Sequence, residues 1–315
     1  MNQSATVSNA HRTTWRVALG ALFVALTLAR VAAQTPAPPV GVTTQSAIVY
    51  GQAAGRPLLL DAYLPGTNYA RPRPGVLVVH GGGWEGGGRH EGYYQKLATD
   101  LAEAGFAAFS VDYRLVRRPA DGVGAQNSFP APWDDCQRAV RWVARHAAEF
   151  GVEPRRLGAV GVSAGGHLVA LLGTRDTRDN ADAELAAFPS RVRAVVDIFG
   201  PADLTQAFPA VNLSGITVQG MVDNLVGSTN AAARRAASPQ FFIDDRTVPF
   251  LIFQGDRDPL VPVAQSRDFA AALRNAGREV AYIEFPGEGH GFGQPENVAR
   301  VNREMIAFFR RTLGE

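Results

Sequence analysis

Ser163 is the residue of this sequence whose surroundings most clearly predict chemistry. It lies in Gly161-Val-Ser-Ala-Gly165, between a short apolar run and an apolar helix-forming stretch. On so sharp a strand-to-helix turn the serine Oγ is exposed, and glycines are needed because a Cβ would collide with neighbouring backbone. The amides that follow open a helix, whose positive dipole end faces the hydroxyl. The pattern predicts a nucleophile, although glycine-rich strand–helix turns are also common structural devices.

A serine hydroxyl needs a base to take its proton and a carboxylate to hold that base in the right tautomer. Two later loops supply such groups. Asp256 and Asp258 follow one apolar run, and His290 follows the next in Glu-Gly-His-Gly-Phe. The order serine, acid, histidine is the one expected when these groups lie at successive strand ends. From the residues alone, either aspartate is a candidate for the acid.

Alternating apolar strands and helices are predicted to position these groups. Two strands are expected between Ser46 and Leu64, and the later strands and helices alternate. This order predicts an α/β fold with a mostly parallel sheet and helices on both faces, whose carboxyl ends carry the function. Residues 202–245 are less periodic and are predicted to form a small cap. The expected later strands are 75–79, 106–115, 157–162, 192–199, 248–254 and 280–285, and the expected helices are 94–104, 134–150, 264–276 and 297–312.

The N-terminus is predicted to be a targeting segment. Two arginines precede the apolar run 17–29, and Val31-Ala-Ala33 offers small residues for cleavage, so residues 1–33 resemble a secretory signal peptide. The run is short for a membrane-spanning helix, although an uncleaved anchor is an alternative. Residues 34–44 are proline-rich and are expected to be a linker before a domain at 45–315. We therefore expect a secreted or periplasmic protein without stable membrane association.

Charge and cysteine usage exclude several classes of function. Residues 1–33 contain three arginines and no acid, so the net charge of +2 becomes +2 − 3 = −1 after cleavage. Such a charge gives no basis for binding nucleic acid or an anionic membrane. Cys136 is the only cysteine, which excludes an internal disulfide, and its apolar helical setting predicts a buried, inert thiol. No cysteine cluster or His-Glu-x-x-His motif supports a metal site, and no cofactor is expected.

Taken together, seven segments resemble the α/β-hydrolases of the bacterial feruloyl- and acetyl-esterase kind, which are related to hormone-sensitive-lipase-like esterases. The similar segments cover nearly the whole chain from about Ile48 to Leu313. Each segment is weak alone, but the set in this order is specific. The segments are Leu60–Pro65, His80–Trp84, Val111–Arg114, Gly161–Gly166, Phe199–Leu204, Gly255–Pro262 and Gly289–Gly291.

The resemblance assigns roles residue by residue. It implies that Ser163 is the nucleophile and that His290 is the general base and acid. The acid in similar families lies just before the Pro-Leu-Val-Pro segment, which favours Asp258 and leaves Asp256 as the rival. The resemblance also implies an oxyanion hole formed by the amides of three residues, because bare glycine backbone can approach a substrate oxygen closely. These three residues are Gly82, Gly83 and Ala164.

The remaining histidines and one tryptophan receive weaker interpretations. His90, in a glycine-rich loop, and Trp84 are candidate substrate-binding residues, the latter as a pocket wall. His80 is expected to brace the glycine loop rather than to take part in catalysis. His167 is expected to be a packed or capping residue, and His146 is expected to lie on a helix surface.

Two structural roles are also predicted for charged residues. Asp112 and Arg114 resemble an ion pair under the glycine loop, and Asp134 and Asp135 are expected to cap the helix that they open.

These observations predict an exported serine esterase that acts through an acyl-enzyme. The expected substrates are small-molecule or carbohydrate esters with short or aromatic acyl groups. An amidase or peptidase with the same three residues is the main alternative, and a non-catalytic binding protein of the same fold is another. Because the base must be neutral, activity is expected to rise through roughly pH 6–7, where histidine ordinarily titrates. The oligomeric state cannot be derived from the sequence.

Overall fold

The structure is a computed structural model that describes residues 41–66, 69–118, 124–177, 182–213 and 215–314. The predicted signal peptide and residues 34–40 of the predicted linker lie outside these ranges. The first strand begins at Thr43, two residues before the predicted start of the domain at residue 45. Among the described residues, no helix is both long enough and apolar enough to cross a membrane.

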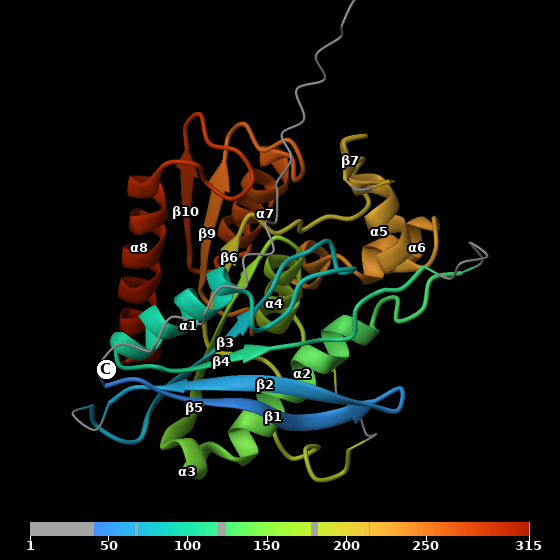
Figure 1. The fold of residues 1–315 in the computed structure, drawn as a ribbon. Coiled ribbons are helices and arrows are strands. Elements are labelled where there is room, and N and C mark those ends of the chain that lie inside the picture. The colour runs from blue at the N-terminus through green and yellow to red at the C-terminus, as the bar shows by residue number, and fades with distance from the viewer. Residues whose placement is uncertain (1–40, 67–68, 119–123, 178–181, 214, 315) are drawn as a thin grey trace, which may run out of the picture. The chain divides into compact units, whose positions relative to one another are not determined.

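An eight-stranded sheet in the order β1-β2-β4-β3-β5-β6-β9-β10 forms the centre of the fold (Figure 1). The β1–β2 and β2–β4 pairs are antiparallel, and every pair from β4 to β10 is parallel. The predicted mostly parallel sheet is therefore confirmed. The strands are β1 (Thr43–Ala53), β2 (Arg56–Leu64), β3 (Arg73–Val79), β4 (Ala107–Val111), β5 (Val152–Val162), β6 (Val195–Ile198), β9 (Phe250–Gly255) and β10 (Val280–Phe285).

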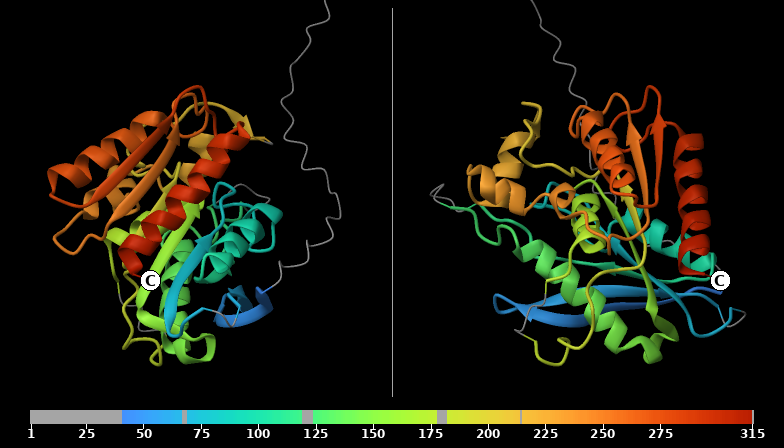
Figure 2. Two further views of the ribbon diagram at one scale, coloured as in Figure 1. Left: turned by 90° about the vertical axis from the view of Figure 1, so that its left-hand side faces the viewer. Right: turned by 180° about the vertical axis from the view of Figure 1, so that it is seen from behind.

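Helices cover both faces of the sheet, and two apolar clusters form the core. Successive residues of β3 alternate between the clusters: Val76 and Val78 face one, and Leu77 and Val79 face the other. The first cluster packs against α1 and α8, which lie on the same side of the sheet (Figure 2). The second packs against α2, α4 and α7. These helices are α1 (Gly92–Glu103), α8 (Pro295–Leu313), α2 (Ala131–Arg145), α4 (Ala164–Thr174) and α7 (Val263–Asn275).

One predicted helix is interrupted. The stretch expected at 134–150 forms α2 and a short α3 (Ala147–Phe150), which are separated by His146. His146 is half-buried; its ring stacks on Trp142 with centroids 4.1 Å apart and bonds the Trp142 carbonyl at 2.8 Å. The predicted surface position of His146 is therefore only partly correct, because its ring covers the end of α2.

The expected cap at 202–245 contains small elements that pack onto the second core cluster. Val222 and Leu225 of α5 are fully buried there. The α5 and α6 helices lie together beside the sheet (Figure 1). The elements are β7 (Asn212–Leu213), β8 (Ile216–Thr217), α5 (Val218–Val226), α6 (Ala231–Ala236) and the 3₁₀ helix η1 (Pro239–Phe242).

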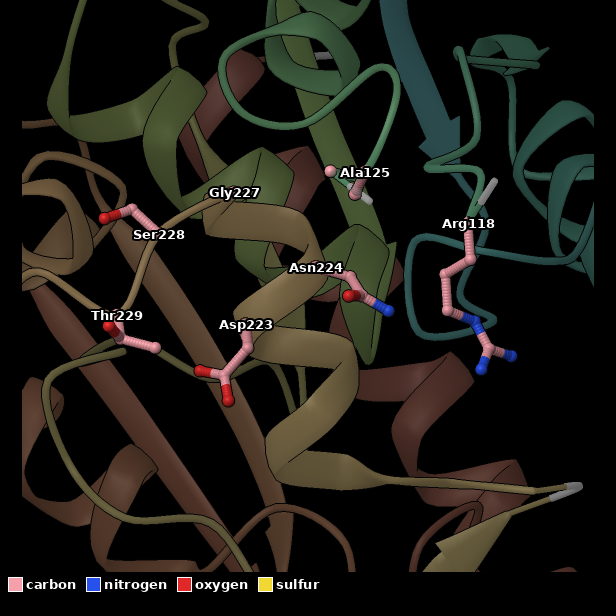
Figure 3. A pocket seen from close by; sticks show the side chains of 8 residues that line it. Arg118, Ala125, Asp223, Asn224, Gly227, Ser228 and Thr229 are labelled. Atoms are coloured by element: carbon pink, nitrogen blue, oxygen red, sulfur yellow. The ribbon is translucent and has the colours of Figure 1, made fainter. Parts of the chain in front are cut away.

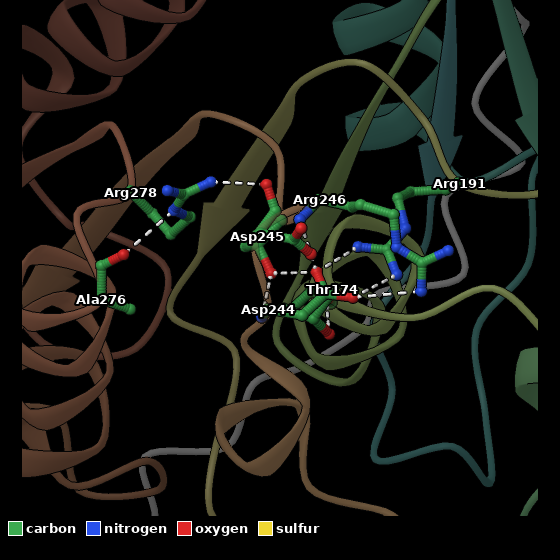
Figure 4. Close-up of polar contacts among 9 residues, drawn as sticks. Thr174, Arg191, Asp244, Asp245, Arg246, Ala276 and Arg278 are labelled. Carbon is green, nitrogen blue, oxygen red and sulfur yellow. Dashed lines mark hydrogen bonds and ion pairs between the residues drawn. The ribbon is translucent and has the colours of Figure 1, made fainter.

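A cluster of polar residues connects the loops that precede the parallel strands β6, β9 and β10 (Figure 4). Arg191, before β6, donates to both carboxylate oxygens of Asp244 at 2.9 and 3.2 Å. Arg278, before β10, donates to the Asp245 carbonyl at 2.6 Å and to the Ala276 carbonyl at 3.1 Å. These contacts lie at the amino ends of the strands, so they stabilise the edge opposite to the one where function is expected.

Candidate active site

Ser163 lies on a strained turn between β5 and α4. Its φ of 55° and ψ of −117° are unusual for a residue with a side chain, and its amide donates to the Ile198 carbonyl at 2.8 Å. A Cβ on Gly161 would lie 2.1 Å from the Gly165 carbonyl oxygen, and a Cβ on Gly165 would lie 2.2 Å from the Val79 carbonyl oxygen. The two glycines are therefore required by close backbone contacts, as the pattern predicted.

The structure brings the three predicted side chains into one hydrogen-bonded chain. The Ser163 Oγ lies 2.9 Å from His290 Nε2, and His290 Nδ1 lies 2.7 Å from Asp258 Oδ2. With Nδ1 protonated toward the carboxylate, Nε2 is the nitrogen that can accept the serine proton. The Asp258 side chain is fully buried, whereas that of His290 is 17% exposed. Of these two side chains, only that of His290 is accessible to solvent.

The choice between the two aspartates follows from their partners. Asp258 Oδ1 accepts the amides of Leu260 and Val261 at 2.8 and 2.9 Å, which orients Oδ2 toward His290. Asp256 Oδ1 instead accepts the Gly287 amide at 2.7 Å. Of the two aspartates, Asp258 bonds the imidazole and Asp256 bonds the Gly287 amide, so the geometry agrees with the resemblance-based choice.

Three backbone amides near the hydrogen-bonded series Asp258–His290–Ser163 have no protein acceptor. Within the described residues, the N–H groups of Gly82, Gly83 and Ala164 have no hydrogen-bond acceptor. The preceding amide, that of Gly81, is used by Tyr94 Oη at 2.7 Å. Gly82 and Gly83 have φ values of 104° and 59°, which turns their peptide units in a way that glycine adopts without strain. The predicted oxyanion-hole residues therefore have the free donors that such a site needs.

His80 and two tyrosines hold the glycine loop. His80 is buried, its Nδ1 bonds the Gly81 carbonyl at 2.8 Å, and its ring stacks on Tyr113 with centroids 4.2 Å apart. Burial lowers the pKa of His80, which favours the neutral ring. Tyr113 Oη donates to the His80 carbonyl at 3.1 Å. These contacts agree with the predicted bracing role of His80.

Trp84 and His167 pack edge to face behind the glycine loop, with ring centroids 5.4 Å apart. Trp84 is only 4% exposed. His167 is fully buried and bonds the Ala237 carbonyl through Nε2 at 2.7 Å, and burial lowers its pKa to about 4. The packed role of His167 is confirmed. His90 is exposed and bonds none of the three residues of the hydrogen-bonded chain, so substrate contact by Trp84 or His90 stays a prediction.

Glu288 supports the His290 loop and was not identified from the sequence. Its buried carboxylate accepts the amides of Gly293 and Gln294 at 2.6 and 3.1 Å and the side-chain amide of Asn297 at 2.6 Å. The bond from Asn297, together with those from the two amides, lowers the pKa of Glu288. An acidic residue shortly before a helix start was the available signal.

The predicted ion pair between Asp112 and Arg114 does not form. Arg114 pairs with the buried Asp135, with bonds of 2.8 Å from Nε and Nη2, and does not pair with Asp112. Asp112 instead pairs with Arg89. The two residues of the predicted pair lie on one short segment after β4, but each side chain turns to a partner on another segment.

The predicted caps of α2 were also wrong. The helix begins at Ala131, earlier than expected, and its N-cap is Pro130, which has no side-chain cap. The Asp135 carboxylate accepts a hydrogen bond from Arg114, and the Asp134 carboxylate accepts one from the side-chain amide of Gln137 at 3.2 Å. Cys136, on the same helix, is fully buried as predicted, and burial raises the pKa of its thiol well above the usual value.

The cap segment contacts the glycine loop directly. A Cβ on Gly83 would lie 2.5 Å from Met221 Sδ of α5. Glu85, two residues later, accepts a bond from the Asn224 side chain at 2.8 Å and pairs with Arg118 at 3.4 Å. The loop that carries the free amides is therefore in contact with α5 at Gly83 and Glu85.

A pocket of about 290 Å³ lies between α5 and the segment around Arg118 (Figure 3). Asn224 and Arg118 reach in from opposite sides, and both contact Glu85. The lining residues are Arg118, Gly124, Ala125, Asp223, Asn224, Gly227, Ser228 and Thr229.

Comparison with known proteins finds several esterases among the similar proteins. Over 264 residues the chain is 31% identical to esterase LipQ of Mycobacterium tuberculosis, and this match covers 83% of the chain but 60% of LipQ. A truncated carbohydrate esterase from gut microbiota has a TM-score of 0.71 and 26% identity, covering 89% of this chain and all (100%) of that one.

A further structural relative is Thermogutta terrifontis esterase 2. In its form phosphorylated by paraoxon it has a TM-score of 0.67 and 25% identity, covering 88% of this chain and 95% of that one. The same esterase has also been solved with propionate bound. The α/β-hydrolase fold expected from the sequence is therefore confirmed. Residues 60–273, which include Ser163 and Asp258, match the BD-FAE family, and the chain belongs to this family of α/β-hydrolase esterases.

Proposed function

We propose that this chain hydrolyses carboxylic esters through a covalent acyl-enzyme. Ser163 Oγ attacks the ester carbonyl carbon while His290 Nε2, 2.9 Å away, takes its proton. Asp258, 2.7 Å from Nδ1, keeps the imidazole in the required tautomer and stabilises the imidazolium that forms. His290 then gives the proton to the departing alcohol. Water repeats the two steps on the acyl-enzyme and releases the acid.

The negative charge of the tetrahedral intermediate would be held by backbone amides. The N–H groups of Gly82, Gly83 and Ala164 have no acceptor among the described residues. Ala164 directly follows Ser163, and a Cβ on Gly81, next to Gly82, would lie 3.3 Å from the Ser163 Cβ. Donors of this kind need no rearrangement when charge develops, and loss of one costs other enzymes about 3 kcal/mol of transition-state stabilisation. The α4 helix opens at Ala164, so its dipole adds to the same effect.

The observation that carries this proposal is the continuous chain Asp258–His290–Ser163 beside amides without acceptors. The esterase names of the relatives support ester substrates. The paraoxon-phosphorylated form of Thermogutta esterase 2 supports a covalent mechanism, and its propionate-bound form supports a short acyl group.

For the alcohol part of the substrate we propose a hydroxyl-rich group such as a carbohydrate. Asn224 and Arg118, which line the pocket, both contact Glu85, and Glu85 lies two residues after Gly83 in the glycine loop. Its side-chain amide, hydroxyl and guanidinium groups are suited to sugar hydroxyls. The carbohydrate-esterase name of a structural relative supports the same class.

The first experiment combines labelling with turnover. A fluorophosphonate probe is expected to label the wild-type chain rapidly and to leave Ser163→Ala unlabelled, with esterase activity reduced by about a millionfold as in other serine hydrolases. Substrates are p-nitrophenyl esters of two to twelve carbons, acetylated xylan, methyl ferulate and the matching p-nitroanilides. Faster cleavage of the anilides would favour the amidase alternative. Labelling without turnover of any ester, or labelling retained in Ser163→Ala, would contradict the proposal.

We also propose that residues 1–33 direct export and are then removed. The apolar run after Arg12 and Arg16 supports this proposal. Expression of the full chain in a Gram-negative host, followed by fractionation and N-terminal mass determination, tests it. A periplasmic or extracellular product that begins near Gln34 is expected. A cytoplasmic product that keeps residue 1 would contradict export.

A further inference from the structure

Phe199, directly after β6, has a backbone conformation that few residues with a side chain adopt. Its φ is +45°, in the left-handed region, which costs free energy and persists only where the surroundings impose it. Two bonds impose it here. The Phe199 amide donates to the Phe253 carbonyl at 2.8 Å, and the next amide, that of Gly200, donates to the buried Asp197 carboxylate at 2.8 Å.

The strained turn contacts both reacting residues of the proposed mechanism, Ser163 through its backbone amide and His290 through its ring. The Ile198 carbonyl accepts the Ser163 amide at 2.8 Å, which fixes the serine turn. The Phe199 ring packs against the His290 imidazole with centroids 4.4 Å apart and planes 53° apart. Phe199 is 2% exposed, so this ring has little room to move. Two adjacent residues of one strand end therefore reach the hydroxyl side and the imidazole side of the Ser163–His290 bond.

From this juxtaposition we infer that Phe199 is a positioning residue, which holds the His290 imidazole at the tilt that directs Nε2 to Ser163. The inference rests on the proposed function and adds a residue to it. A bond from Nδ1 to Asp258 fixes one atom of the imidazole but leaves the plane of the ring free to turn about that bond. A rigid aromatic surface at 4.4 Å removes this freedom. A turn without the left-handed residue would direct the ring elsewhere, which explains why the strain is kept.

The chain offers a matched control for this inference. Phe253, on β9, is fully buried in the same apolar cluster as Phe199 but has no ring contact with His290. Phe199→Leu and Phe253→Leu therefore remove similar aromatic volume from one core, and both are expected to lower the melting temperature. The Phe253 carbonyl that accepts the Phe199 amide is backbone and remains in the variant.

The experiment measures kcat and KM for p-nitrophenyl acetate, with enzyme concentration normalised by fluorophosphonate titration at a temperature where both variants are folded. Phe199→Leu is expected to lower kcat at least tenfold while KM stays within twofold, and to slow inactivation by paraoxon by a similar factor. Phe253→Leu is expected to keep both rates within twofold of the wild type.

Three results would overturn the inference. Equal kcat in the two variants would give Phe199 a packing role alone. A raised KM with unchanged kcat would make Phe199 a wall of the substrate pocket. A wild-type chain that hydrolyses no ester would refute the proposed function and this inference with it. An active wild type with equal variants would refute the inference alone.

Discussion

The buried carboxyl group of Asp197 leads to a quantitative prediction about stability and pH. Asp197 lies on β6, is 1% exposed and accepts the Gly200 amide at 2.8 Å. Burial raises its pKa to about 7, and the bond from Gly200 opposes this only in part. A Cβ on Gly166 would lie 2.3 Å from the carboxylate, so the backbone of α4 packs directly over this group.

The sign of the effect follows from proton binding. An aspartate in an unfolded chain has a pKa of about 3.9, so between roughly pH 4 and 7 the native state keeps a proton that the unfolded state has released. The stability due to this group is fully present below about pH 4 and is lost as the pH rises to 7. Three pKa units correspond to roughly 4 kcal/mol at most, of which roughly 3 kcal/mol falls between pH 5 and 8.

Asp197→Asn keeps the size of the side chain and an acceptor for the Gly200 amide but does not titrate. The variant is therefore expected to gain stability relative to the wild type as the pH rises, by roughly 3 kcal/mol from pH 5 to pH 8. The assay is urea unfolding of both proteins at pH 5, 6, 7 and 8, followed by tryptophan fluorescence. Other groups titrate in both proteins, so the difference between them isolates Asp197. A difference in unfolding free energy that is the same at pH 5 and pH 8 would refute the reasoning.

Three further predictions test the site and its support. Asp258→Asn is expected to lower kcat by about 10⁴ because the imidazole tautomer is no longer fixed, whereas Asp256→Asn is expected to keep kcat within tenfold; the reverse order in ester hydrolysis would exchange their roles. Gly161→Ala places a Cβ 2.1 Å from the Gly165 carbonyl oxygen and is expected to abolish folding or to lower the melting temperature steeply. Gly92→Ala, whose new Cβ has no atom within 4 Å, is expected to leave the melting temperature unchanged. Equal melting temperatures of the two variants would contradict the close contact at Gly161. The pKa of His167 is lowered to about 4, so its contribution to stability is present above about pH 6.5 and is lost as the pH falls toward 4. His167→Gln is expected to remove roughly 3 kcal/mol of this pH dependence in urea unfolding, and an unchanged pH slope would count against it.

Features that depend on the order of elements could be predicted from the sequence. A parallel sheet brings the carboxyl ends of its strands to one edge, so Ser163 after β5, Asp258 after β9 and His290 after β10 meet whatever the loops between them do. The glycine requirement at Gly161 is local, because the facing carbonyl belongs to the same turn.

Features that depend on side-chain direction between loops could not be predicted in the same way. Asp112 and Arg114 are two residues apart after β4, which suggested a pair. In an extended segment such neighbours usually share a face, yet Arg114 turns to Asp135 on α2 and Asp112 turns to Arg89. The sequence contains all four residues but no signal for which loops cross above the end of β4.

The same distinction explains why the sequence predicted no positioning role for Phe199 or Glu288. Each acts on the loop that holds His290. Phe199, at the end of β6, packs against the His290 ring, and Glu288 bonds the Gln294 amide before α8. Neither residue type suggests a role in positioning His290. A phenylalanine ordinarily packs in the apolar core, and a glutamate in a polar loop is ordinarily solvated. What reveals them is geometric: a left-handed φ at Phe199 and a buried carboxylate with three donors at Glu288. Strain and desolvation both cost free energy, so residues that keep them beside the hydrogen-bonded chain are the ones to test for a role in positioning it.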